Sequence, residues 1–144
     1  MPRHLLAMMT AMGLIVAAEV PAALAQAPAK QHALSTVAGW SQLRDEIARM
    51  TSLSPDEIDI HATNAMLRVV LVNTVYNNDP ASDREYLAST ISALVNKNAA
   101  SDARYRTLLV LHVEFANRGR LSTKTVDSVE FRRGADGRFG RHPT

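Results

Sequence analysis

Residues 106–117, RTLLVLHVEFAN, decide the fold class that this sequence predicts. Apolar and polar side chains alternate along the stretch, with His112 and Glu114 standing between apolar neighbours. The side predicted to be buried carries Leu109, Leu111, Val113 and Phe115. A period of two indicates a strand with one buried face, and a sheet that buries one face needs a second layer to cover it.

Further strand patterns lie on both sides of this segment in the chain. Residues 125–133 alternate in the same way, and residues 138–142 can return as a short edge strand after the turn at residues 134–137. Residues 57–73 contain an alternating segment followed by a run of branched apolar residues. We interpret them as a hairpin with its turn near residues 63–65, although one long strand would also fit.

Two amphipathic helices are predicted to form the covering layer. The first spans residues 36–50, and the second runs from Ser82 to about Asn98, with Ser82 and Glu85 at the spacing of a capping box. The apolar faces consist of Trp40, Leu43, Ile47 and Met50 in the first helix, and of Leu87, Ile91, Leu94 and Val95 in the second. We therefore predict a two-layer α+β domain, with both helices on one face of an antiparallel sheet of four to five strands.

The N-terminal residues 1–25 have the pattern of a signal peptide. Arg3 and His4 precede an uncharged apolar run over residues 5–18, and Ala23-Leu24-Ala25 supplies the small residues that a signal peptidase reads. The run is shorter than the about 20 residues that cross a bilayer. We expect export and cleavage near Ala25, to a periplasmic or secreted protein, although retention of this segment as an anchor stays open.

The remaining chain has the size of one domain. We expect residues 26–35 to form a flexible lead-in and residues 36–144 to form a single α+β domain without a membrane span. The sequence contains no cysteine, which excludes disulfides, thiol nucleophiles and iron–sulfur clusters. Its formal net charge of +2 does not by itself imply a polyanionic partner, and we expect no nucleic-acid binding.

One candidate site lies on the polar side of the predicted sheet. His112 and Glu114 point the same way on their strand, and His61 lies on the corresponding side of an earlier strand, next to Asp59. Two imidazoles and one carboxylate could provide three zinc ligands with an open position for water, or could serve acid–base catalysis. A solvated face with charge pairs explains the same residues, for example Glu114 with Arg106 or Arg132.

A second candidate is the basic C-terminal stretch. Arg132, Arg133, Arg138 and Arg141 surround a predicted hairpin tip, with Phe139 among them. Because an exported protein meets anionic lipid, lipopolysaccharide or wall polymer, these arginines could contact an anionic envelope surface. Charges that protect an exposed sheet edge from association offer the other explanation.

The sequence shows no nucleophile elbow, no His-Glu-x-x-His motif and no phosphate-binding loop, and it indicates no cofactor. We therefore expect a small exported domain without catalysis, which acts as a binding or accessory module of the cell envelope and has an envelope protein or polymer as its partner. Two alternatives stay open. One is a metal-dependent or acid–base enzyme that uses the polar sheet face, and the other is an electrostatic adaptor that binds anionic envelope polymers through the C-terminal arginines.

Overall fold

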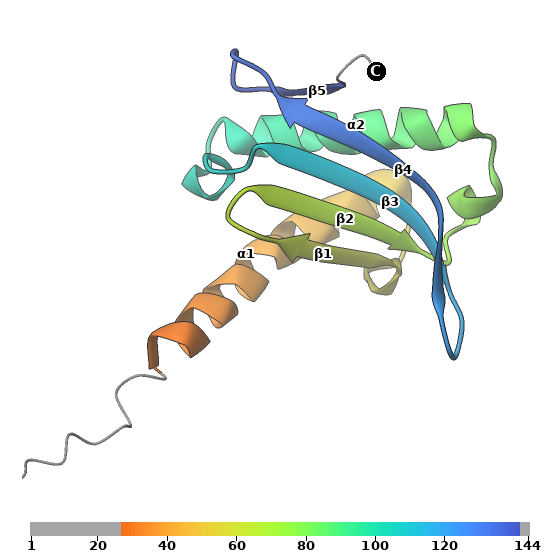
Figure 1. Cartoon of the computed structure of the whole chain (residues 1–144), viewed down its shortest axis with the longest axis horizontal. Coiled ribbons are helices and arrows are strands. Elements are labelled where there is room, and N and C mark those ends of the chain that lie inside the picture. Colours follow the sequence, from red (N-terminus) through yellow and green to blue (C-terminus); the bar gives the residue numbers. More distant parts are fainter. Residues whose placement is uncertain (1–26, 142–144) are drawn as a thin grey trace, which may run out of the picture.

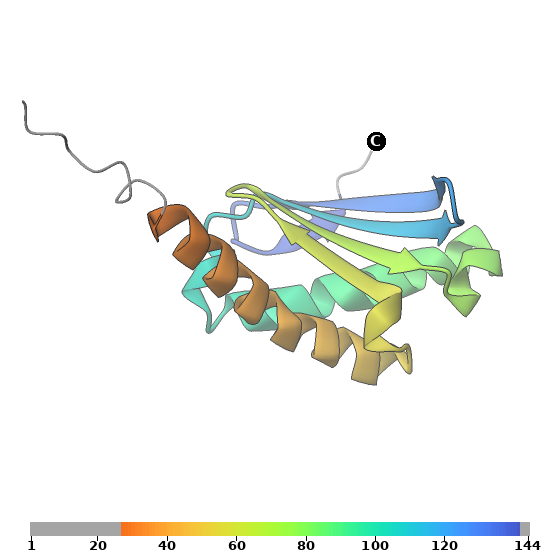
Figure 2. The ribbon, with the colours of Figure 1, turned by 90° about the horizontal axis from the view of Figure 1, so that it is seen from below.

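The computed structural model describes the backbone of residues 27–141 and the side chains from residue 39 onward. It is an α+β domain of two layers, in which two helices lie against one face of a five-stranded sheet and the other face stays open (Figures 1 and 2). The helices and strands therefore confirm the predicted fold class. The expected signal peptide and its cleavage site lie outside the described residues.

The sheet contains its strands in sequence order. They are β1 (Ile58–Ala62), β2 (Met66–Val72), β3 (Val110–Arg118), β4 (Thr123–Arg133) and β5 (Phe139–Arg141). The predicted hairpin over residues 57–73 is confirmed, with its turn at residues 63–65, where the N–H of Thr63 donates to the carbonyl of Met66 at 2.8 Å. The edge strand after the glycine turn is also present, as β5.

One pairing differs from the antiparallel sheet that we predicted. β1–β2, β3–β4 and β4–β5 are antiparallel, whereas β2 and β3 pair in parallel, with Met66 opposite Val110 and Val72 opposite Ala116. The helix α2 (Ala81–Ala99) causes the difference, because it returns the chain along the sheet before β3 begins. Two strands joined by such a crossover run in the same direction, whereas only strands joined by tight turns must be antiparallel.

Helix α1 (Ala27–Thr51) begins earlier than predicted, so the backbone of residues 27–35 is helical where we expected a flexible lead-in. This stretch contains three Ala, together with one Lys, one Gln and one Leu, all of which have high helix propensity. Pro28 is the second residue of the helix, a position where proline removes no hydrogen bond within the helix.

The capping box predicted at Ser82 and Glu85 is wrong. Helix α2 begins before Ser82, with Pro80 at the cap position and no side-chain cap, while the carboxylate of Glu85 pairs with Arg141. A capping box with the same spacing exists instead at Ser54 and Glu57, where it starts the short helix η2 (Pro55–Glu57) before β1.

The core lies between the helices and the inner face of the sheet. It includes Leu43, Ile47, Leu87, Ile91 and Val95 from the helices, and Leu111, Val113, Phe115, Val129 and Phe131 from β3 and β4. At the start of β3 the burial differs from the prediction, because Leu108 is buried and Leu109 is 58% exposed. The strand begins only at Val110, after the short helix η4 (Ala103–Tyr105), so the alternation does not extend back to these two residues.

Candidate functional site

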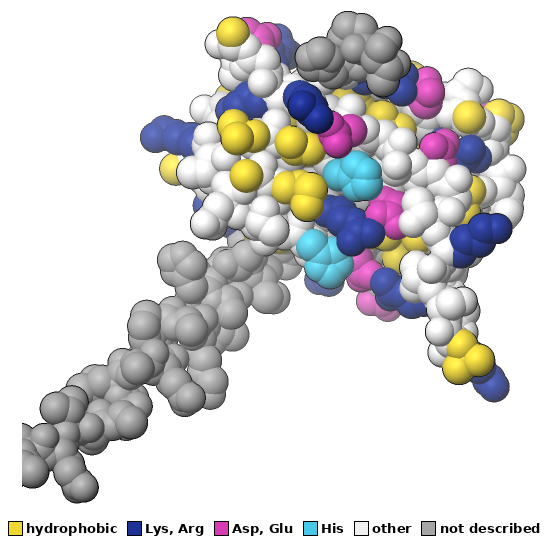
Figure 3. Space-filling model, viewed as in Figure 1, with side chains coloured by type: hydrophobic (Ala, Val, Ile, Leu, Met, Phe, Trp, Pro, Cys, Tyr) yellow, Lys and Arg dark blue, Asp and Glu magenta, His cyan; other side chains and the backbone are white. Residues whose placement is uncertain are grey.

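The predicted polar sheet face exists, but the structure does not bring its two histidines together. Across the strands His61 lies opposite Arg68, and Arg68 lies opposite His112, so the arginine stands between them. Two strand spacings separate the histidine backbones by about 10 Å. Figure 3 shows this face, with basic side chains lying between the two histidines.

Both carboxylate oxygens of Glu114 accept hydrogen bonds from neighbouring side chains on this face. Its side chain is buried, Oε2 accepts hydrogen bonds from Nε of Arg68 at 2.9 Å and from Nη2 of the same residue, and Oε1 accepts from Oγ1 of Thr125 at 2.6 Å. Burial acts to raise the pKa of Glu114, but the hydrogen bonds from Thr125 and Arg68 and the positive charges nearby outweigh it and hold the pKa below its ordinary value. Glu114 is therefore an ionised structural group.

The partners that we expected for Glu114 were different. Arg132 pairs through Nε with Glu130 at 2.8 Å, and Arg68 takes the place that we proposed for Arg106 or Arg132. Among residues 39–141 no cluster of three or more histidine and acidic side chains could hold a metal ion. Sequence alternation placed these side chains on the correct face but contained no information on which strands are neighbours.

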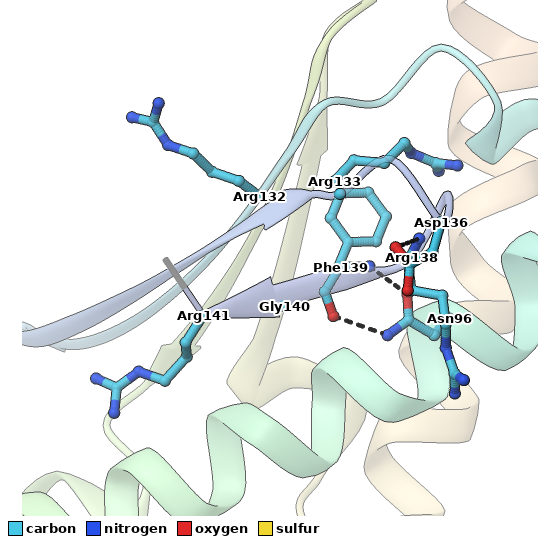
Figure 4. Close-up of a pocket in the computed structure, with 9 residues that line it drawn as sticks. Asn96, Arg132, Arg133, Asp136, Arg138, Phe139, Gly140 and Arg141 are labelled. Carbon is cyan, nitrogen blue, oxygen red and sulfur yellow. Dashed lines mark hydrogen bonds between the residues drawn. The ribbon is translucent and has the colours of Figure 1, made fainter. Parts of the chain in front are cut away.

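A cavity of about 610 Å³ lies where β4, β5 and their connecting turn meet the C-terminal half of α2 (Figure 4). We call it the arginine cavity. It is lined by Asn96, Arg132, Arg133, Gly134, Asp136, Arg138, Phe139, Gly140 and Arg141. All four arginines that the sequence singled out border this cavity, together with the carboxylate of Asp136, although the side chains of Arg132 and Arg133 leave opposite faces of β4 (Figure 4).

Arg133 is a fixed part of the cavity wall. Its guanidinium donates to three backbone carbonyls, from Nε to Leu108 at 2.7 Å, from Nη1 to Gly137 at 2.9 Å and from Nη2 to Tyr105 at 2.6 Å. It also lies over the ring of Phe139, with 4.8 Å between the guanidinium carbon and the ring centroid. A cation held in this way presents charge to the cavity and has two of its five N–H groups left for a ligand.

The other arginines keep donors available. Arg141 forms a two-point ion pair with Glu85 at 3.0 and 3.2 Å, and Arg132 uses Nε toward Glu130. Within the described residues, the side chain of Arg138 has no hydrogen bond or ion pair, and it is exposed. Arg138 is thus the donor that a ligand in the cavity could reach first, because the guanidinium of Arg132 lies beside Glu130 on the open face of the sheet (Figure 4).

The backbone around the cavity is held by residues that sequence reasoning missed. Asn96 of α2 pins β5 by donating from Nδ2 to the carbonyl of Phe139 at 3.0 Å and by accepting from its N–H at 2.7 Å (Figure 4). Gly137 has a φ of +78°, which closes the turn before β5 without the strain that a side chain would add. The Asp136-Gly137 pair signalled this turn in the sequence, whereas an asparagine in a helix carries no signal of a distant strand.

The cavity is suited to binding an anion. Arginines present planar forks of donors that match phosphate and carboxylate oxygens. Among the described residues, no histidine, serine or threonine lines the cavity, and its carboxylate, Asp136, accepts a hydrogen bond from the N–H of Arg138 at 3.1 Å.

No helix in the described part of the chain is long and apolar enough to cross a membrane. Comparisons with protein-family models, with curated protein sequences and with solved structures found no match to this chain.

Proposed function

We propose that this protein is an exported, non-catalytic binding module of the cell envelope that takes an anionic group of an envelope polymer into the arginine cavity. The observation that carries the proposal is that Arg133, Arg138 and Arg141 line one space of about 610 Å³, with Arg132 at its border. The signal-peptide pattern of residues 1–25 supports the location, since it predicts that the domain meets envelope polymers.

The different hydrogen bonding of the arginine side chains supports the same function. Arg133 is fixed by the fold and supplies a permanent charge, while Arg138 is unengaged by the described residues and can close on a ligand. A prepared charge lowers the entropy cost of binding, because fewer side chains need to be ordered. The ligand class is a phosphate or carboxylate group, and repeated groups along a polymer would let neighbouring arginines contribute.

An enzyme on the polar sheet face is supported less well. Arg68 separates His61 from His112, and Glu114 has both carboxylate oxygens occupied, so the three residues lack the convergence that metal binding or acid–base chemistry requires.

The test is a titration of the protein with two soluble probes, inorganic polyphosphate and polygalacturonate, followed by fluorescence anisotropy of labelled polymer at low and high salt. Arg138→Glu should weaken binding about tenfold, because it removes a free cation and adds an anion to the cavity. Arg49→Glu is the matched control, since it makes the same charge change on an exposed position of α1. Equal weakening by both variants, or unchanged binding in Arg138→Glu, would contradict the cavity as the site.

A further inference from the structure

The hairpin between β3 and β4 extends beyond the rest of the sheet. β2 pairs with β3 only as far as Ala116, yet β3 and β4 continue to pair to Arg118 and Thr123, and the N–H of Gly119 donates to the carbonyl of Ser122 at 2.8 Å. All ten residues from 117 to 126 are exposed. Figures 1 and 3 show the hairpin projecting from the body of the domain.

The base of this hairpin is braced by two asparagines. Asn73 donates from Nδ2 to the carbonyl of Arg118 at 3.0 Å and accepts from its N–H at 2.7 Å, so its side-chain amide replaces the missing neighbour strand. Asn77 is buried and donates from Nδ2 to the carbonyl of Ala116 at 2.9 Å and to the side chain of Asn117 at 2.7 Å. A two-stranded ribbon is only marginally stable alone, so these hydrogen bonds stabilise the base of the hairpin.

An ion pair with the edge strand β1 also stabilises the base of the hairpin. Nη2 of Arg118 lies 2.5 Å from Oδ2 of Asp59 on β1, and the side chain crosses the open face of β2 to reach it. Val70 and Val72 lie on that face of β2 and are only 5% exposed each, in one apolar cluster with Ala116. The polar and apolar contacts together attach the base of the hairpin to the sheet.

The tip is apolar at its end and basic around it. Leu121 is 100% exposed, so it contributes nothing to the core of the domain. Arg118, Arg120 and Lys124 surround it, and residues 117–126 contain no acidic residue. An exposed leucine flanked by basic residues is the combination with which amphipathic segments bind an anionic lipid interface, the apolar group being buried and the cations lying at the headgroups.

We infer that the β3–β4 hairpin contacts an anionic lipid surface, with Leu121 inserted at the boundary of headgroups and acyl chains and with Arg120 and Lys124 against lipid phosphates. This contact is independent of the arginine cavity, which lies at the β4–β5 turn. Insertion of one leucine strengthens binding about tenfold, and each basic residue at an anionic surface adds about fivefold. The interaction is therefore weak and reversible, and it orients the domain on the surface.

The test uses the absence of cysteine in the sequence, which permits one labelled position. The variant Leu121→Cys is labelled with an environment-sensitive fluorophore at its single cysteine. The full chain is expressed in a host that can export it, and the protein is purified in the form which that host produces. Leu109→Cys is the matched control, because Leu109 is also an exposed leucine but precedes β3, at the other end of that strand. Vesicles of equal parts phosphatidylcholine and phosphatidylglycerol should shift the emission at position 121 to the blue, and vesicles of pure phosphatidylcholine should do so much less.

Unlabelled variants then give the energetics by co-sedimentation with the same vesicles. Leu121→Ser should lower the affinity for these vesicles about tenfold, and the double change Arg120→Glu and Lys124→Glu should lower it further. Leu109→Ser should leave the bound fraction unchanged. Thermal unfolding of Leu121→Ser should match the original chain. Unchanged emission from the label at position 121 after vesicles are added would refute the inference. An emission shift that depends on protein concentration alone would also refute it, because that result would mean that the tip contacts a second copy of the chain.

Discussion

Replacing Arg133 by alanine tests whether this arginine stabilises the fold, in contrast to Arg138, which we propose contacts the ligand. The change removes three hydrogen bonds from one guanidinium to the carbonyls of Tyr105, Leu108 and Gly137, and it also removes the cation–π contact with Phe139. Water can enter beside these partly buried carbonyls, so about 1 kcal/mol is expected for each hydrogen bond, and the ring contact adds about 0.5 kcal/mol. The expected loss of unfolding free energy is about 3 kcal/mol.

The assay is thermal and urea unfolding followed by circular dichroism. A loss of about 3 kcal/mol in a domain of this size lowers the unfolding temperature by about 10–15 °C. Arg138→Ala is the control, and it should cost less than about 0.5 kcal/mol, because its side chain is exposed and has no partner among the described residues. If Arg133→Ala is as stable as Arg138→Ala, the guanidinium does not hold the segment before β3, and the assignment of roles in the cavity is wrong.

Three further variants, at buried or partly buried positions, test other parts of the fold. Glu114→Gln should cost about 1–3 kcal/mol at neutral pH, as judged by urea unfolding, because charge-assisted hydrogen bonds are lost. Since the fold lowers the pKa of Glu114, its contribution is complete above the ordinary value of 4.5 and disappears as the pH falls through the folded value, so Glu114→Gln should flatten the acid limb of a stability–pH curve. Phe115→Ala, at a fully buried position of β3, should cost about 3–5 kcal/mol in the same unfolding assay, and a smaller loss would place the core elsewhere. Asn96→Ala should speed amide hydrogen exchange at Phe139 while leaving exchange at Val113 unchanged, because β5 then loses its anchor to α2.

The sequence was most informative where short-range periodicity decides the structure. Alternation placed Val113 and Phe115 in the core and Glu114 on the opposite face, and helical spacing placed Leu87 and Ile91 against them. These predictions depend on the geometry of one element at a time, which a few consecutive residues determine.

Long-range relations were harder to predict for a physical reason. The order of strands places Arg68 between His61 and His112, and nothing in the alternation of any one strand encodes that order. The four arginines of the cavity were recognised as a group because they are close in the chain. The three carbonyls that hold Arg133 belong to η4, to the residues just before β3 and to the β4–β5 turn, so its structural role became visible only in the fold.

The parallel pairing of β2 with β3 has a consequence for how this chain folds. The two flanking hairpins join residues that are close in sequence, but the central pairing joins Met66 to Val110 and needs α2 to be in place between them. Contacts of high sequence separation form late, because closing a long loop costs entropy before the contacts compensate for it. We therefore expect the pairing of β2 with β3 to form after the two hairpins, which can form first.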